Sequence, residues 1–360
     1  MKKLEQKDLE ALLLLNRTPG LRMRSLSCLS EQGFSPSEIV ERIELGENEA
    51  WRESLKETRR IFEPEREMAE LENLGIELVP FGSFRYPALL GEISDPPLIL
   101  YVRGNLLESD EAAVALVGSR HPSLYGMEQA RRFASKLAGW GLTIVSGFAR
   151  GIDRASHEAA LTVSYGRTIA VLGSGLDVIY PKEHRALYEE IAERGALISE
   201  FALGTPPLAE NFPKRNRIIS GLSLGVMVVE AHSRSGSLIT AHLAAEQGRE
   251  VFAMPGRVDQ LGSHGTHRLI KEGAQLVELP EEVLETLSPQ LWPLTTSPPT
   301  GFTAEEQKLL GLFEGLSLTS SELALRGRLP FSSAASLLTR LELKGALRRR
   351  LDGRYERISI

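Results

Sequence analysis

The sequence predicts an α/β fold in which a parallel β-sheet is covered by helices on both faces. Short apolar runs follow one another through the middle of the chain, and amphipathic segments of helical periodicity separate them. Such runs are typical of strands that are buried on both faces of a sheet. The expected strands are 114–117, 142–145, 168–172, 196–198, 225–229 and 250–253. The expected intervening helices are 128–138, 183–193 and 238–247, with right-handed crossovers.

Composition and charge limit the class of protein. The chain has 360 residues, 42% apolar and 25% charged, which leaves room for two or three domains with sizeable cores. Its single cysteine, Cys28, cannot form an internal disulfide and fits a reducing compartment. The net charge of −6 argues against a uniformly basic nucleic-acid coat but is compatible with a local basic groove.

The start of the chain shows no targeting signal. Met1-Lys2-Lys3 is followed by charged residues such as Glu5 rather than by an apolar run. No stretch approaches the ~20 apolar residues that a membrane span needs. We therefore expect a cytoplasmic protein without a membrane span.

Residues 1–75 are expected to form a helical domain. Pro19-Gly20 interrupts the first apolar face, a second helix is expected over 24–32, and Ser35 opens a third. Pro-Gly between two short helices suggests a SAM-like or helix-hairpin-helix-like unit, which would bind phosphate backbones. A second glycine, which that motif usually needs, does not follow, so a packing role is favoured.

The sheet domain is expected over 76–287, with an early strand at 98–102. Residues 288–302 are rich in proline and are typical of a linker. Residues 303–360 predict a third unit, in which three helices precede a hairpin with the turn Asp352-Gly353. Three helices followed by a hairpin are typical of a winged helix.

Glycine-rich turns follow the expected strands. In parallel sheets, ligands bind beyond the carboxyl ends of the strands, where small residues let backbone N–H groups and helix N-termini approach an anion. Gly173-Ser174-Gly175 is one such turn. The candidate binding residues in the other turns are Gly118, Ser119, Arg120, Gly147, Phe148, Arg150, Ser235, Gly236 and Ser237. Four such turns with arginines nearby favour phosphate binding.

The strongest local feature is the segment 211–217, which we expect in a loop before a helix that starts near Asn216. Its cations suit backbone phosphates, and its aromatic ring offers a stacking face to an unpaired base. The candidate binding residues here are Phe212, Lys214, Arg215, Asn216 and Arg217. Burial of Phe212 in the core is the competing interpretation.

Signatures of catalysis are missing. The turn 118–122 lacks the second and third glycines of a dinucleotide fingerprint, which argues against hydride chemistry. His264 and His267 lie three residues apart without further ligands nearby, so we expect no metal site. No catalytic triad pattern occurs, and we expect neither catalysis nor a cofactor.

Three acidic residues lie close to the glycine turns. Asp153 stands at an expected helix start, where an N-cap is its ordinary role. Glu200 and Glu230 end strands at the ligand edge and are candidates for orienting the arginines.

In order and spacing, these motifs resemble the DNA-processing protein A (DprA/Smf) family. The resemblance covers 86–277 strongly, and it includes Pro255-Gly256 and Gly262-Ser263-His264-Gly265-Thr266. It implies an extended Rossmann-like domain between an N-terminal helical domain and a C-terminal winged-helix-like domain. Some family members carry a lysine just before the Phe-Pro pair, where this chain has Ala209-Glu210, and Lys214 is the candidate substitute.

The resemblance also implies a function. Family members bind incoming single-stranded DNA during natural transformation, commonly as homodimers, protect it, and help to load the RecA recombinase for DNA recombination. We therefore expect a DNA-binding protein of competence and DNA processing, whose partners are single-stranded DNA, RecA and a second copy of the chain.

Two other classes of function are weighed against this one. Nucleotide-hydrolysing enzymes of the lysine-decarboxylase-like group share the sheet but place a glutamate pair where this chain has Ile239 and Thr240, so the acid that would assist water is missing. A transcription factor would use the winged helix, whose basic run 348–350 lies on the expected wing.

Overall fold

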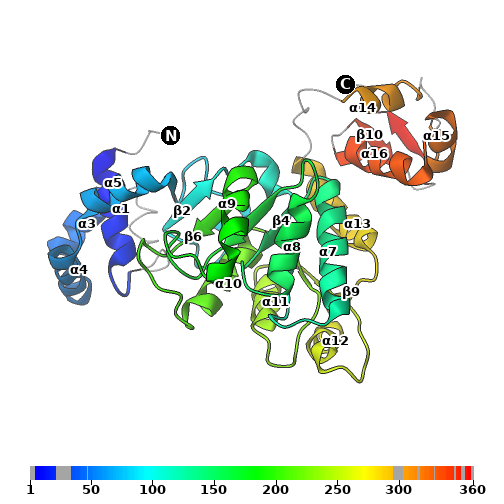
Figure 1. Ribbon diagram of the computed structural model, residues 1–360. Coiled ribbons are helices and arrows are strands. Elements are labelled where there is room, and N and C mark those ends of the chain that lie inside the picture. The colour runs from blue at the N-terminus through cyan, green and yellow to red at the C-terminus, as the bar shows by residue number, and fades with distance from the viewer. Residues whose placement is uncertain are drawn as a thin grey trace.

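The computed structural model describes residues 5–21, 34–46, 48–294, 303–313, 317–327, 329–343, 346–349 and 353–357. It confirms the α/β fold: one nine-stranded sheet, mostly parallel, carries helices on both faces (Figure 1). The strands are β1 (Ile76–Pro80), β2 (Ile99–Gly104), β3 (Ala113–Val117), β4 (Thr143–Ser146), β5 (Thr168–Val171), β6 (Ala196–Ser199), β7 (Gly225–Val228), β8 (Glu250–Ala253) and β9 (Gln275–Leu276). Each of the six strands expected after residue 110 lies within one residue of its predicted bounds.

The strand order is β1-β2-β6-β5-β4-β3-β7-β8-β9. Strands β3 to β9 run parallel, whereas β1 pairs with β2, and β2 with β6, in antiparallel fashion. From β3 the chain first builds the sheet outward through β4, β5 and β6, and then returns to place β7 on the other side of β3. This change of direction is a topological switch point, where ligands bind in open α/β sheets.

Alternate residues of each central strand enter cores on opposite faces of the sheet. Val114 and Leu116 of β3 pack in one core, while Ala113 and Ala115 pack in the other. The first core takes residues from α7 (Leu124–Gly139), α8 (Ile152–Leu161) and α13 (Pro280–Leu294). The second takes residues from α6 (Ala88–Gly91), α10 (Asn211–Gly221), α11 (Gly236–Glu246) and α12 (His264–Lys271). Helix α9 (Arg185–Arg194) packs on β2, β5 and β6.

In the described part of the chain, four helices precede the sheet: α1 (Gln6–Arg17), α3 (Pro36–Glu44), α4 (Glu49–Ile61) and α5 (Pro64–Leu74). They are tied to the sheet domain by polar contacts around the buried Glu67. Its carboxylate accepts hydrogen bonds from Arg17 Nε at 2.8 Å and from the backbone N–H of Leu203 at 3.0 Å. The helix expected over 24–32 lies outside the described residues.

The C-terminal unit contains α14 (Ala304–Leu310), α15 (Ser320–Gly327), α16 (Phe331–Leu343) and an antiparallel pair, β10 (Leu347–Arg349) and β11 (Tyr355–Arg357). This order agrees with the expected three helices and hairpin, while the winged-helix assignment itself stays a prediction. Asp352 of the expected turn, Arg350 of the basic run and residues 295–302 of the expected linker lie outside the described residues. The predicted start of the linker at 288 is wrong, because α13 continues through Leu294. None of the described helices is both long and apolar enough to cross a membrane.

Candidate nucleic-acid interface

A cavity of about 670 Å³ opens at the switch point, beyond the carboxyl ends of β3 and β7. Loops that are far apart in the sequence build it, together with the N-terminal turns of α10 and α11. Nine of the residues singled out in the sequence line it: Gly118, Ser119, Arg120, Phe212, Arg215, Asn216, Ser235, Gly236 and Ser237. The switch point therefore gathers most of the candidate residues at one place.

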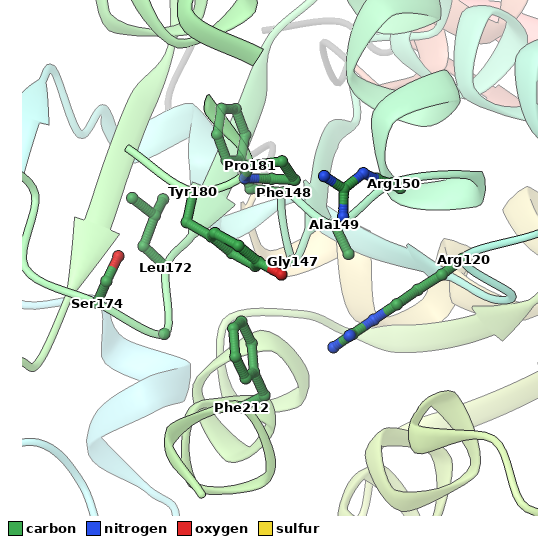
Figure 2. Close-up of a pocket in the computed structure, with 11 residues that line it drawn as sticks. Arg120, Gly147, Phe148, Ala149, Arg150, Leu172, Ser174, Tyr180, Pro181 and Phe212 are labelled. Atoms are coloured by element: carbon green, nitrogen blue, oxygen red, sulfur yellow. The ribbon is translucent and has the colours of Figure 1, made fainter. Parts of the chain in front are cut away.

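Three further candidates, Gly147, Phe148 and Arg150, line an adjoining hollow that shares Arg120, Tyr180 and Phe212 with the larger cavity. Figure 2 shows Phe212 and Tyr180 next to each other, with Arg120 and Arg150 on the side toward the loop after β4. Lys214 and Arg217 line neither space.

Phe212 lies in the first turn of α10, so its predicted placement in a loop is wrong. The helix can begin at Asn211 although Pro213 follows, because a proline in the first turn has no helical hydrogen bond to lose. The ring is half-buried and packs on Gly173, where an added Cβ would come within 3.0 Å of it. The Tyr180 ring lies 6.0 Å away, centroid to centroid.

Arg120 is the cation most directly placed at Phe212. Its guanidinium carbon lies 5.2 Å from the ring centroid, and the side chain is exposed. Arg120 forms no ion pair with any described residue. A guanidinium held by an aromatic face rather than by a carboxylate is available to pair with a phosphate.

Arg215 is buried, with only 3% of its surface exposed, and supports the cavity from below. Its guanidinium donates hydrogen bonds to the carbonyl oxygens of Gly147, at 2.7 Å, and of Val171, which ties the ends of β4 and β5 together. Burial lowers the pKa of Arg215 to about 10, although nearby Asp153 opposes the shift. Burial likewise raises the pKa of Asp153, and Arg215 opposes that shift. Arg215 thus lends positive charge to the cavity floor without reaching into solvent.

Phe148 is buried, although the sequence singled it out as a binding residue. Its ring packs edge-on against His184 at 5.2 Å and against Tyr188 at 6.1 Å. Its backbone has a φ of 59°, an uncommon value for a residue other than glycine. Such conformations are found most often at functional sites, and Phe148 lies in one of the loops that form this one. Phe148 therefore shapes the loop after β4 and presents no face for stacking.

The remaining cations and acids are paired in ways the sequence did not specify. Arg217 donates hydrogen bonds to Glu200 at 2.6 Å and to Asp95 at 3.4 Å. Glu200 therefore orients an arginine, as the sequence led us to expect. Glu230 pairs with no arginine that the structure describes. It accepts a hydrogen bond from the backbone N–H of Ser123 at 3.0 Å, at the start of α7.

Lys214 and Arg150 each lie beside a carboxylate. Lys214 donates to Glu210 at 3.4 Å, one helical turn away, and Arg150 pairs with Glu183. All four side chains are substantially exposed, so these pairs are weak and can exchange for a phosphate.

Sequence reasoning missed several residues of the cavity wall, of which Arg234 and Tyr180 bear most directly on binding. Arg234 is exposed, lines the cavity and forms no ion pair within the described part of the chain. It directly precedes Ser235, and that position beside a glycine turn was the signal that could have identified it. Tyr180, which lines both spaces, gave no such signal because its segment has no periodicity.

Among the described residues, no three His, Cys, Asp or Glu side chains are grouped so as to hold a metal ion. The side chains of the site supply cations, aromatic rings and hydroxyls. The N-terminus of α11, which Ser235 caps, lies beside them. This set suits an anionic polymer that carries exposed rings.

Comparison with known proteins gives a consistent result. The family described as DNA recombination-mediator protein A matches residues 77–288. The chain is 50% identical over 249 residues to Protein Smf of Escherichia coli (69% of this chain and 66% of that protein). It is 42% identical over 223 residues to DNA processing protein DprA of Bacillus subtilis (62% and 75%). The match thus spans slightly less than two thirds of the E. coli protein.

Two solved structures are similar in fold. DNA processing protein A from Streptococcus pneumoniae aligns with a TM-score of 0.65 and 35% identity, over 79% of this chain and 98% of that one. DNA processing protein A from Helicobacter pylori, studied for its single-stranded DNA binding mode, aligns with a TM-score of 0.53 and 31% identity, over 59% and 97%.

Proposed function

This chain belongs to the DNA recombination-mediator protein A family, and from that membership we propose that it binds single-stranded DNA in the cavity at the carboxyl edge of its sheet. One observation carries the proposal. Arg120 and Arg234, which form no ion pair among the described residues, line the same cavity as the half-buried ring of Phe212, next to the N-terminus of α11. The cations can pair with phosphates, and the ring can stack on a base, whose face is exposed only in an unpaired strand.

The family resemblance also supports a wider role, which we include in the proposal. The bound strand is protected and passed to the RecA recombinase, during natural transformation in organisms that take up DNA, and the protein works as a homodimer in the cytoplasm. The Helicobacter pylori relative, with its single-stranded DNA binding mode, supports the first step of this proposal. For its structural units we propose the division expected from the sequence, 1–75, 76–287 and 303–360, with the second unit extended to Leu294 because α13 continues to that residue.

The residues that line the cavity argue against the alternative function, hydrolysis of nucleotides. Ile239 and Thr240 line it at the first turns of α11, where an enzyme of the lysine-decarboxylase-like group places its glutamates. The carboxylate that does line the cavity, Asp153, is buried and accepts a hydrogen bond from the backbone N–H of Ala149 at 3.3 Å. We expect no release of free base from nucleoside monophosphates.

A competition assay tests the proposed function. A fluorescent single strand of mixed sequence is bound to the full-length chain and displaced by unlabelled single strand or by its duplex, at several salt concentrations. We expect the single strand to compete better at every salt concentration, and the affinity to fall as salt rises. Equal competition by duplex would favour the winged-helix interpretation instead.

A further inference from the structure

A second cavity, of about 470 Å³, shares no lining residue with the DNA-binding cavity. Segments 84–89 and 106–111 form its walls, and Ile169 and Leu222 reach its floor. Ile169 stands near the start of β5, and segment 106–111 leads into β3. The cavity therefore lies at the amino edge of the parallel strands, opposite the edge that gathers the DNA-binding loops.

This cavity combines apolar surface with acidic charge that has no counter-charge. Phe84, which is 90% exposed, and Leu107, which is 48% exposed, both line it, so two exposed apolar side chains lie at the same cavity. Glu108 and Glu111 form no ion pair with any residue that the structure describes. Partial burial, with Glu108 nearby, raises the pKa of Glu111, as expected where no cation stabilises a carboxylate.

The other two charged residues of the cavity are already paired. Arg85 forms an ion pair with Glu77. Asp110 accepts from Arg167 Nε at 2.8 Å and from Thr143 Oγ1 at 2.8 Å. The net charge offered to a ligand is therefore that of Glu108 and Glu111.

The wall that carries these acids is held rigidly. Besides Arg167 and Thr143, Asp110 accepts from the backbone N–H of Leu107 at 2.8 Å, which fixes the short helical turn η1 (Glu108–Glu111). On the facing wall, Tyr86 donates to the carbonyl oxygen of Pro97 at 2.9 Å and packs edge-on against Phe81. A preformed wall loses little conformational freedom on binding, which favours a binding role.

We propose that this cavity is a docking site for a protein partner that inserts a large apolar side chain flanked by lysine or arginine. The apolar floor accommodates the side chain, and Glu108 and Glu111 meet the flanking cations. The same acids repel phosphates, so nucleic acid is not the occupant. Because the two cavities lie at opposite edges of the sheet, the partner docks without displacing bound DNA.

The test uses the full-length chain and a fluorescent peptide, acetyl-Gly-Lys-Trp-Lys-Gly-amide. Two matched peptides replace both lysines by glutamate or the tryptophan by alanine. We expect saturable binding of the first peptide only. The double variant Glu108→Gln/Glu111→Gln should weaken it about fivefold, since two exposed charge pairs are lost. The control Glu281→Gln/Glu285→Gln removes the same charge from exposed residues of α13 and should leave binding unchanged.

Three results would overturn the proposal. The Lys-Trp-Lys peptide does not bind saturably, or either of its two matched peptides binds equally well, or the Glu108 and Glu111 variant weakens binding no more than the α13 control does. Competition between single-stranded DNA and the peptide would contradict the separation of the two sites. Single-stranded DNA binding by both variants is measured in parallel and is expected to stay intact, so this test is independent of the proposed DNA-binding function.

Discussion

The guanidinium carbon of Arg120 lies 5.2 Å from the centroid of the Phe212 ring, which joins the loop after β3 to the first turn of α10. Tyr180 lies against the same ring at 6.0 Å. A base that stacks on Phe212 therefore has to take the place of one of these neighbours. We expect it to displace Arg120, whose guanidinium then pairs with the adjoining phosphate, so that stacking and charge pairing occur together.

Replacement of Phe212 tests the stacking contact. Phe212→Ala should weaken single-strand binding roughly tenfold, because base stacking is worth ~1–3 kcal/mol. The dependence of affinity on salt should hardly change, since no phosphate contact is lost. Phe212→Trp should retain binding, and fluorescence anisotropy measures both. A sharp drop in melting temperature with normal affinity of the folded fraction would make the ring a core residue.

Replacement of Arg120 tests the phosphate contact. Arg120→Ala should weaken binding and flatten the plot of log affinity against log salt by ~0.7, the contribution of one phosphate contact in a single strand. The melting temperature should stay unchanged because the side chain is exposed. The control is Arg132→Ala, which removes an exposed charge from α7 and lies outside the DNA-binding cavity and the hollow that adjoins it. An identical slope for both variants would place the charge contact elsewhere.

Arg217 should behave differently from Arg120. Its side chain is only 14% exposed and pairs with Glu200 and Asp95. Arg217→Ala leaves these partly buried carboxylates without their cation and should lower the free energy of unfolding by about 2 kcal/mol, with no change in the salt slope. Urea unfolding and titrations at several salt concentrations separate the two effects. A flatter slope with normal stability would support the DNA contact that the sequence predicts for Arg217.

The six central strands and the gathering of the glycine turns were predictable because both depend on local pattern and on the geometry of parallel sheets. The roles of individual cations were not. Sequence places arginines at the surface, whereas Arg215 is buried because two strand-end carbonyls accept its N–H groups. The start of α10 was missed because Pro213 is equally compatible with a loop and with a first helical turn. Such contacts depend on segments brought together only by the fold.

Stability should fall as the pH falls below the ordinary pKa of histidine. Burial, with His184 and Arg215 nearby, lowers the pKa of His157 to about 3. Between pH 6.5 and 3 the unfolded chain therefore binds a proton that the folded chain does not, which favours unfolding. Protonation of His157 in the unfolded chain should by itself lower the free energy of unfolding by about 2 kcal/mol between pH 6.5 and 5.

Unfolding of His157→Gln across this pH range isolates that contribution. The variant should show a smaller loss of stability on acidification than the parent chain. His121→Gln, at an exposed position, should keep the parent pH dependence. An equal loss in the parent and the His157 variant would show that other groups cause the acid sensitivity.

Photochemical cross-linking tests the location of the DNA most directly. A single strand that carries 5-iodouracil is irradiated with the full-length chain, and the attached peptides are identified by mass spectrometry. The proposed interface predicts cross-links at Phe212 and Tyr180, whose rings line the cavity, and their loss when unlabelled single strand is in excess. Cross-links confined to the C-terminal unit, with none at the loops of the cavity, would contradict the assignment of the cavity as the single-stranded DNA interface.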